Sequence, residues 1–343
     1  MTVAAAVFVF GLLVLVHELG HFITAKFTGM KVDEFALGFG PQLLKKRIGE
    51  TVYSIRAIPL GGFNDIAGMD PADNKAGDRG FCEKPVLSRM IVILAGAGMN
   101  FILPIILFFG IYATIGIGKP AETPVIGAVI EGRSAESAGL MAGDKILSVN
   151  GENIMTWENF SDKIKSLEPN QSAKIIYERN SQVAELSVTP EYDEQAKRNF
   201  IGVQSAIEYE RQSIPVAFEK AVTNTKEIMF MMISMLVDIF KAPTQAELAG
   251  PLGIAQMAGQ VAESGFVPLL NFAALLSLNL GIINLLPVPA LDGGHFVNLV
   301  IEAVRGKPLG TKALAYTQRI GIALLLLLMV FATKNDIVRL FFN

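Results

Sequence analysis

Cysteine, histidine and tryptophan are scarce in this chain of 343 residues, which has one cysteine, three histidines and one tryptophan. The single cysteine, Cys82, excludes an intrachain disulfide and a zinc site built from cysteine ligands. Charged residues make up only 18% of the chain, below the roughly 25% of an average soluble domain. The net charge of −3 provides no basic field for a polyanion, which excludes a nucleic-acid-binding protein.

Hydrophobic residues make up 51% of the chain and gather in long runs. The runs at residues 2–27, 90–117, 266–286 and 315–333 are long enough to span a bilayer, which takes about 20 apolar residues. A fifth run, 228–240, is too short to cross and favours an interfacial or re-entrant segment. No basic stretch precedes the first run, which indicates a retained transmembrane helix rather than a signal peptide. The sequence therefore predicts four transmembrane helices.

Lysine and arginine residues concentrate in the loop after the first run and in the loop after the third. Because cytoplasmic loops carry an excess of these residues, both loops are predicted to be cytoplasmic. Both chain termini and the 118–220 region are then outside the cytoplasm. The residues that carry this argument are Lys26, Lys31, Lys45, Lys46, Arg47, Arg56, Lys75, Arg79, Lys84, Arg89, Arg305, Lys307, Lys312 and Arg319.

Two stretches outside the apolar runs have strand-like patterns. In the first basic loop, segments 32–39 and 53–58 predict a hairpin, which at membrane depth would need a partner for its backbone groups. An ordinary cytoplasmic hairpin is the alternative. Residues 119–206 are charged and turn-rich, and the run GRSAESAGLMAGDKILSVNG at 132–151 resembles a bacterial PDZ domain. PDZ domains add an extended peptide to a sheet edge, and the alternative is a PDZ-shaped spacer without a ligand.

Two of the three histidines lie four residues apart in the first apolar run, as His17-Glu18-Leu19-Gly20-His21. This H-E-x-x-H pattern puts both imidazoles on one helical face, where they can bind zinc, and puts Glu18 beside the metal as general base. Ionisable groups inside a span are costly and usually functional. A catalytic zinc ion takes a third protein ligand. Asp292 and His295 are both candidates, and their spacing does not choose between them.

Together, these motifs resemble the site-2 protease family of intramembrane zinc metalloproteases, in its RseP-like bacterial branch with a single PDZ domain. The resemblance covers nearly the whole chain and rests on HELGH at 17–21, PLGG at 59–62, GPLG at 250–253 and NLLPVPALDGG at 284–294. It implies one Zn²⁺ per chain, held by His17, His21 and Asp292, with Glu18 as the catalytic residue. It also implies that Asn284, Pro287 and Pro289 bind substrate, and that a strand at Gly38, Phe39 and Gly40 pairs with an unwound substrate.

The expected fold is a polytopic α-helical membrane protein with four transmembrane helices, a membrane-associated β-hairpin and an inserted extracytoplasmic α/β PDZ domain. Its predicted parts are an N-terminal transmembrane metalloprotease part (1–118), the PDZ domain (119–206), an amphipathic membrane-associated linker (207–265) and a C-terminal transmembrane part (266–343).

The resemblance places the protein in the bacterial cytoplasmic (inner) membrane, with its active site near the cytoplasmic side. Its expected partners are the lipid bilayer, single-span membrane protein substrates such as anti-sigma factors or remnant signal peptides, and a peptide at the PDZ domain. No nucleic acid is expected. Two other functions are disfavoured. A metal transporter would carry several ionisable residues along a path, whereas this sequence has one compact cluster. An inactive scaffold commonly lacks the glutamate, whereas Glu18 is present.

Overall fold

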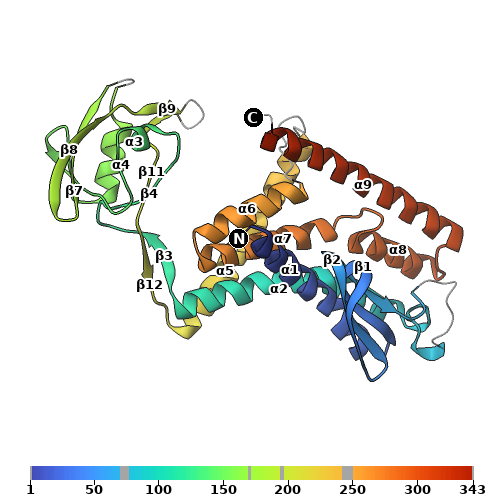
Figure 1. Ribbon diagram of the computed structural model, residues 1–343. Coiled ribbons are helices and arrows are strands. Elements are labelled where there is room, and N and C mark those ends of the chain that lie inside the picture. Colours follow the sequence, from blue (N-terminus) through green and yellow to red (C-terminus); the bar gives the residue numbers. More distant parts are fainter. Residues whose placement is uncertain (1, 70–76, 169–170, 194–196, 242–249, 342–343) are drawn as a thin grey trace. The chain divides into compact units, whose positions relative to one another are not determined.

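The computed structural model describes residues 2–69, 77–168, 171–193, 197–241 and 250–341 (Figure 1). Lys75 and residues 242–249 of the predicted linker lie outside the described residues. The chain forms two compact units, each of which is described by itself. Residues 1–111 and 214–343 make up the helical unit, and residues 112–213 make up the inserted unit.

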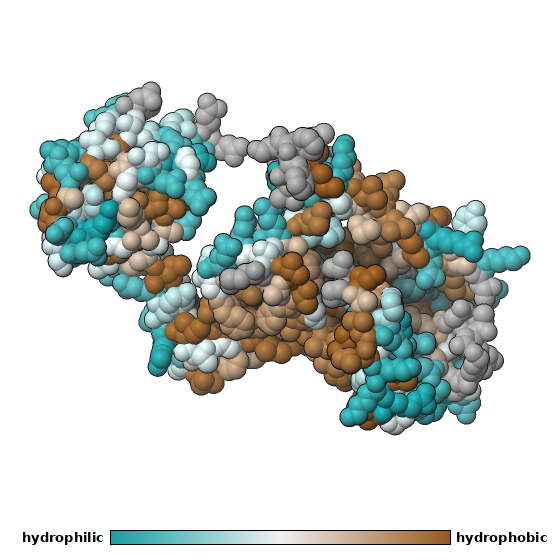
Figure 2. Space-filling model, in the orientation of Figure 1, coloured by the Kyte–Doolittle hydropathy of each residue, from teal (hydrophilic) through white to brown (hydrophobic). Residues whose placement is uncertain are grey.

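Four helices of the described residues are long and apolar enough to cross a membrane, which agrees with the four predicted spans. The second helix begins and ends slightly earlier than predicted. Hydrophobic surface covers much of the helical unit (Figure 2), and exposed apolar side chains such as Leu327 and Val330 favour contact with lipid. The four helices are α1 (Thr2–Phe27), α2 (Val86–Thr114), α7 (Phe266–Asn284) and α9 (Thr311–Phe341), of which the Lys312–Arg339 part is the span.

The apolar run 228–240 belongs to a longer helix than the sequence indicated. It forms the second half of α5 (Ile214–Lys241), a helix of 28 residues that is not among the four candidate spans. The predicted segment was too short because hydropathy identifies only the apolar half of this helix. After it comes α6 (Pro251–Glu263), whose first turn is capped by Asp336 of α9. The buried Asp336 carboxylate accepts hydrogen bonds from the backbone N–H groups of Gly250 (3.0 Å) and Gly253 (2.8 Å).

Small side chains let α1 pack closely against its neighbours. Ala5, Ala6, Val9 and Leu13 of α1 form a buried cluster with residues of α6 and α7. Gly20 of α1 lies so near α2 that a Cβ atom there would be 2.3 Å from the backbone oxygen of Ala95. Close approach of this kind is typical of helix packing in membranes, and it brings the HELGH segment against α2.

The predicted hairpin is longer than expected and bends back on itself. Its strands are β1 (Val32–Ile48) and β2 (Thr51–Ile66), and each is used twice in one sheet. Phe35 pairs with both Tyr53 and Asn64, because residues 32–37 lie between the two halves of β2. Residues 62–66 and 42–48 therefore form the two edges. The alternation of apolar and polar residues did not predict this arrangement, because the bends interrupt the alternation.

An ionic cluster at Glu34 stabilises the bent sheet. Its carboxylate accepts hydrogen bonds from the Ser54 hydroxyl (2.5 Å) and from Nη2 of Arg56 (2.8 and 3.0 Å). Burial alone would raise the pKa of Glu34, but these donors outweigh it and hold the pKa below its usual value. The carboxylate is therefore ionised at neutral pH and joins β1 to β2.

A buried ion pair fixes α8 (Asp292–Arg305) to the start of α2. Nη1 and Nη2 of Arg89 bind the two carboxylate oxygens of Glu302 at 3.0 and 2.6 Å. Leu299 of α8 is buried in one cluster with Val92 and Ile93 of α2. These contacts determine where the first residue of α8, Asp292, lies relative to α2. Two short 3₁₀ turns, η1 (Gly77–Arg79) and η2 (Phe81–Glu83), precede α2.

The inserted unit contains a four-stranded antiparallel sheet in the order β6-β5-β7-β8. Helix α4 (Trp157–Lys165) contributes Phe160 and Ile164 to its buried core. Threonine caps this helix, since the Thr156 hydroxyl accepts a hydrogen bond from the Asn159 N–H at 3.1 Å. The sheet strands are β5 (Lys145–Val149), β6 (Glu152–Asn153), β7 (Ala173–Arg179) and β8 (Gln182–Val188).

Three strand pairs and one short helix complete the inserted unit. The helix is α3 (Ser134–Ser137). The pairs are β3 (Ile117–Pro120) with β12 (Ile207–Glu210), β4 (Ile126–Val129) with β11 (Val203–Ser205), and β9 (Glu191–Asp193) with β10 (Arg198–Phe200). The β3–β12 pair makes this unit extend beyond the predicted 119–206 segment at both ends.

Candidate active site

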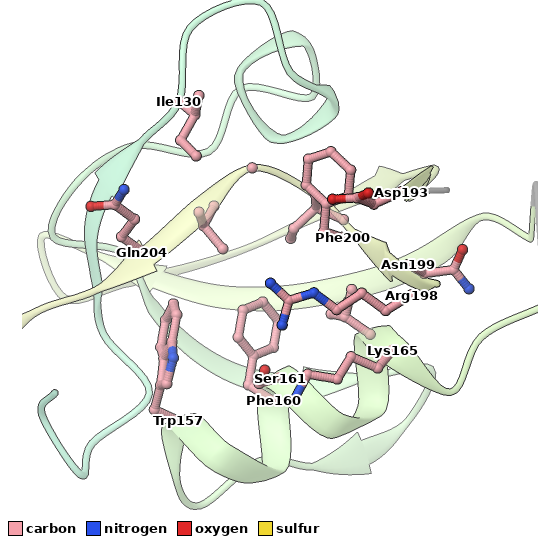
Figure 3. Close-up of a pocket in the computed structure, with 14 residues that line it drawn as sticks. Ile130, Trp157, Phe160, Ser161, Lys165, Asp193, Arg198, Asn199, Phe200 and Gln204 are labelled. Atoms are coloured by element: carbon pink, nitrogen blue, oxygen red, sulfur yellow. The ribbon is translucent and has the colours of Figure 1, made fainter. Parts of the chain in front are cut away.

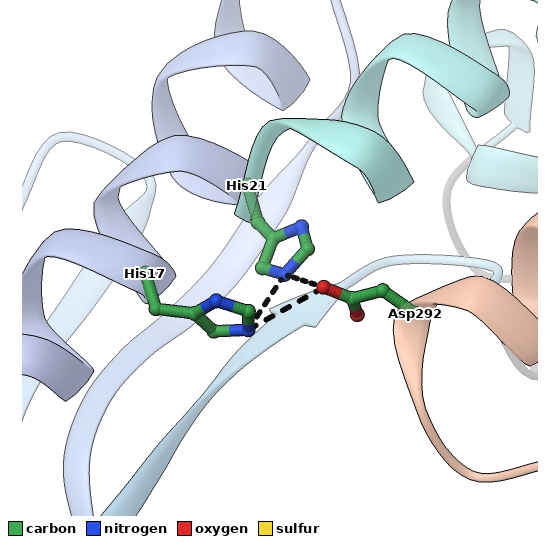
Figure 4. Close-up of side chains that lie close together, drawn as sticks. All are labelled: His17, His21 and Asp292. Carbon is green, nitrogen blue, oxygen red and sulfur yellow. Dashed lines mark hydrogen bonds and ion pairs between the residues drawn. The ribbon is translucent and has the colours of Figure 1, made fainter. Parts of the chain in front are cut away.

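His17 and His21 of α1 and Asp292 of α8 point toward one another (Figure 4). The two Nε2 atoms are 3.3 Å apart, and Oδ2 of Asp292 lies 3.5 Å from Nε2 of His17 and 3.4 Å from Nε2 of His21. All three side chains are at most 16% exposed. Among the described residues, they are the one group of His, Cys, Asp and Glu side chains able to hold a metal ion.

The three ligand atoms fit zinc in spacing and in chemistry. A tetrahedral zinc ion with metal–ligand distances of about 2.0–2.1 Å separates its ligand atoms by about 3.3–3.4 Å. The three measured separations are 3.3, 3.4 and 3.5 Å. In addition, Oδ2 of Asp292 is buried and has no hydrogen-bond partner, which is costly unless a cation neutralises it. His17, His21 and Asp292 would therefore hold the ion and leave one position open.

One face of α2 supports both imidazoles. Nδ1 of His21 donates to the backbone oxygen of Val92 at 2.8 Å, so its Nε2 lone pair is free for a metal. One turn further along α2, Gly96 leaves room for the rings. A Cβ atom at Gly96 would be 2.3 Å from Nε2 of His21 and 2.8 Å from Cε1 of His17. Another turn on, Nδ2 of Asn100 lies 3.1 Å from Nδ1 of His17.

Replacing Gly96 by alanine is therefore expected to weaken zinc binding, because the new methyl group would displace the His21 ring. Gly98→Ala is the matched control, since a Cβ atom at Gly98 meets nothing within 4 Å. Both substitutions raise helix propensity by about 1 kcal/mol, so helix stability does not distinguish them. Zinc content per chain, measured on the purified variants, should fall in Gly96→Ala and stay at the wild-type level in Gly98→Ala. Equal zinc content in both would show that Gly96 does not make room for the ligands.

Glu18 is 8% exposed and is held by the sheet. Nδ2 of Asn64, on β2, donates to Oε2 of Glu18 at 2.7 Å and to the Glu18 backbone oxygen at 2.8 Å. The preceding segment of β2 also lies close, because a Cβ atom at Gly62 would be 2.9 Å from Cγ of Glu18. The candidate base is thus oriented by the edge of the sheet formed by residues 62–66.

The segment between α7 and α8 folds tightly around the first turn of α8. Cβ atoms at Gly293 and Gly294 would be 2.2 Å from the Leu286 oxygen and 2.3 Å from the Val288 oxygen. Only glycine permits such a close approach, which explains the two glycines after Asp292. Pro287 and Pro289 lie in this turn segment, and Asn284 is the buried last residue of α7. Asp292 then begins α8, where the helix dipole favours a negative charge.

Gly38, Phe39 and Gly40 form the bend of β1. Both glycines have positive φ angles, +91° and +82°, and Phe39 stacks on Phe63 of β2 with the ring centroids 6.3 Å apart. His295, the other candidate ligand, lies one turn after Asp292 on α8 and is not in the metal-binding group. The structure therefore brings together His17, His21 and Asp292, with Glu18 adjacent in the chain.

Sequence reasoning gave no role to Asn64, Val92, Gly96 or Asn100. Val92 acts through its backbone oxygen, which no side-chain pattern reveals. Gly96 and Asn100 could have been noticed through their spacing of four residues, which puts them on one face of α2.

The inserted unit has a pocket of its own between α4 and the β10–β11 segment (Figure 3). Its volume is about 310 Å³. The aromatic rings of Trp157, Phe160 and Phe200 line it, and its charged lining residues are Lys165, Arg198 and Asp193. The lining combines apolar surface with a few polar groups, as small ligand sites commonly do.

An H-E-x-x-H helix that meets a third carboxylate ligand defines a zinc metalloprotease, here with the ligand helix among the candidate membrane spans. The model of peptidase family M50 matches residues 5–328. The chain therefore belongs to family M50, the site-2 protease family, and is a zinc metalloprotease. It is 32% identical to the regulator of sigma-W protease RasP of Bacillus subtilis, over 99% of each chain. It is 34% identical to the zinc metalloprotease RasP of Bacillus licheniformis, also over 99% of each chain.

Solved structures similar to part of the chain include two PDZ domains of SdrC-like proteins. The one from Listeria monocytogenes is 20% identical with a TM-score of 0.22, covering 25% of this chain and 90% of that chain. The one from Listeria innocua is 22% identical with a TM-score of 0.23, covering 26% of this chain and 99% of that chain.

Proposed function

We propose that this metalloprotease hydrolyses peptide bonds within the transmembrane segments of single-span membrane proteins, using one zinc ion per chain. The observation that carries the proposal is the His17–His21–Asp292 cluster, whose histidines lie inside an apolar helix long enough to span a membrane. A zinc site on such a helix acts on bonds that lie within or near the bilayer. The compactness of this cluster argues against a metal-transport path, which needs several ionisable sites in sequence.

The residues of the site divide the reaction between them. The bound zinc would polarise the scissile carbonyl and lower the pKa of a water molecule. Glu18 takes the proton of this water and passes it to the leaving amine. The Asn64 amide, 2.7 Å from Oε2 of Glu18, keeps the base oriented during this transfer. Asn284, Pro287 and Pro289 are proposed to bind and shape the substrate backbone next to Asp292.

A helical substrate must unwind, because its amides are already hydrogen-bonded and shielded. The β1–β2 sheet offers a strand to pair with the unwound segment. Residues 62–64 form its edge beside Glu18, which supports this part of the sheet as the pairing strand. The resemblance implied Gly38, Phe39 and Gly40 as the pairing strand itself. In this proposal they form the bend that supports the edge at 62–64, with Phe39 stacked on Phe63.

We place the protein in the inner membrane. The distribution of lysine and arginine supports an orientation in which the chain termini and the inserted unit lie outside the cytoplasm. The active site is then near the cytoplasmic side. Suitable substrates are membrane proteins already shortened by an earlier cut, such as anti-sigma factors or remnant signal peptides. The name of the Bacillus subtilis relative, a regulator of sigma-W protease, supports the first class.

The test is cleavage of a single-span model substrate by the purified full-length protein in proteoliposomes, with the cut bond identified by mass spectrometry. We expect a cut inside the apolar segment, lost after zinc is removed with a chelator and restored when zinc is returned. Cleavage confined to residues outside the membrane, or cleavage that survives complete metal removal, would contradict the proposal.

For the inserted unit, we propose a PDZ domain whose pocket takes an extended peptide segment or a peptide C-terminus. The pocket lining has two positive charges, Lys165 and Arg198, against one negative charge, Asp193, and this balance favours a carboxylate. Its aromatic lining favours an apolar side chain. A fluorescent peptide ending in an apolar residue should bind the full-length protein, and the same peptide with an amidated C-terminus should bind more weakly. Equal binding of the two peptides would favour an extended segment over a C-terminus, and no binding of either peptide would leave only a size-filtering spacer.

A further inference from the structure

Asn100 is a polar residue in the middle of an apolar helix and is 0% exposed. Its Nδ2 lies 3.1 Å from Nδ1 of His17, and its Oδ1 is buried without a hydrogen-bond partner. An unsatisfied buried amide oxygen costs about 1–3 kcal/mol. A buried asparagine at this place therefore calls for a compensating role, and its side-chain amide contacts a candidate zinc ligand.

The tautomer of His17 determines whether it can bind a metal. A neutral imidazole has one N–H and one lone pair. Nε2 of His17 faces Nε2 of His21 and Oδ2 of Asp292, so its lone pair must be free for zinc and the proton must sit on Nδ1. An N–H at Nδ1 requires an acceptor, whereas an amide NH₂ group facing it would force the proton onto Nε2.

The side-chain amide of Asn100 has the same shape after a half-turn, and its oxygen then faces Nδ1 of His17. This orientation reproduces the arrangement at His21, whose Nδ1 donates to the Val92 backbone oxygen at 2.8 Å. The two acceptors then sit two helical turns apart on the same face of α2, on either side of Gly96. Metal-binding histidines in general donate their second ring N–H to such an acceptor.

We propose that Asn100 is a positioning residue: its amide oxygen accepts the Nδ1–H of His17 and so keeps Nε2 unprotonated for the metal. The proposal relies on the proposed function only in taking His17 as a zinc ligand. Helix α7 holds Asn100 in place, because the Ser277 hydroxyl donates to the Asn100 backbone oxygen at 2.8 Å. Gly281 adds to this, since a Cβ atom there would be 3.3 Å from Cβ of Asn100.

Three substitutions separate an acceptor role from a packing role. Asn100→Asp keeps the shape and an acceptor oxygen but has no N–H, so zinc affinity should stay within about threefold of wild type. Asn100→Leu keeps a similar volume without an acceptor, and zinc affinity should fall by about 10–100-fold. Asn279→Leu is the control, since it makes the same change at an exposed asparagine of α7. Its zinc affinity should equal that of the wild type.

Zinc affinity is measured on the full-length protein in detergent, stripped of metal, by competition with a chromophoric chelator. Gel filtration and circular dichroism establish that each variant is folded, and Asn100→Ala replaces the leucine variant if that variant aggregates. Zinc affinity in Asn100→Leu within twofold of wild type would overturn the proposal. Equal losses in the aspartate and leucine variants would overturn it too, because an acceptor would then not suffice. These readouts need no substrate, so they are independent of whether membrane segments are cleaved.

Discussion

Replacing Glu18 by glutamine is expected to lower the rate of peptide-bond cleavage by about 10²–10⁴-fold while zinc stays bound. Proton transfer by a positioned base contributes a factor of this size, and glutamine cannot accept the proton. Glu18 is not among the three side chains whose ligand atoms converge, so the substitution leaves the metal-binding group intact. Cleavage is followed with a single-span model substrate, and zinc content is determined on the same preparations.

The local structure should tolerate this substitution. Asn64 Nδ2, which is 2.7 Å from Oε2 of Glu18, can donate equally well to the amide oxygen of glutamine. Glu263→Gln on α6 is the matched control, because Glu263 is exposed and the same change there should leave cleavage unchanged. If Glu18→Gln cleaves as fast as the control, then Glu18 is not the base, and the proton acceptor lies elsewhere in the site.

The parts of this site that sequence analysis found are those specified by local patterns. His17 and His21 share a helical face because they are four residues apart, and four spans follow from hydropathy because each span is a continuous apolar run. Asp292 came from the resemblance, since its place beside α1 depends on how α8 packs. The Arg89–Glu302 pair, 213 residues apart in the chain, is one of the contacts that determine this packing.

The residues that sequence analysis missed act across elements. The Asn64 amide reaches Glu18 from a strand 46 residues away, on an edge that exists because the sheet bends back on itself. In the sequence, Gly96 is one of several glycines in an apolar helix, and nothing distinguishes it from the others. Its function follows from the space that it leaves for the imidazoles in the structure. Burial and backbone acceptors of this kind follow from tertiary contacts, which composition and periodicity do not encode.

Substituting Asp292 and His295 separately is expected to identify the third ligand through zinc affinity. Asp292→Ala should lower it by at least about 100-fold, because even the loss of a residue that only orients a ligand costs 10–100-fold. His295→Ala should stay near wild type, since His295 is outside the converging group.

The contrast between the two variants is informative because both residues lie in the first turn of α8, so that a general disturbance of this helix would affect both. An effect confined to Asp292 comes from the carboxylate, whose Oδ2 lies 3.4 Å from Nε2 of His21 and has no hydrogen-bond partner of its own. Asp292→Asn refines the result, because it preserves the volume but removes the charge that offsets the cation, and it should also lose affinity. Full zinc binding in Asp292→Ala with loss in His295→Ala would instead require α8 to turn so that His295 faces α1, and the site would then hold three imidazoles.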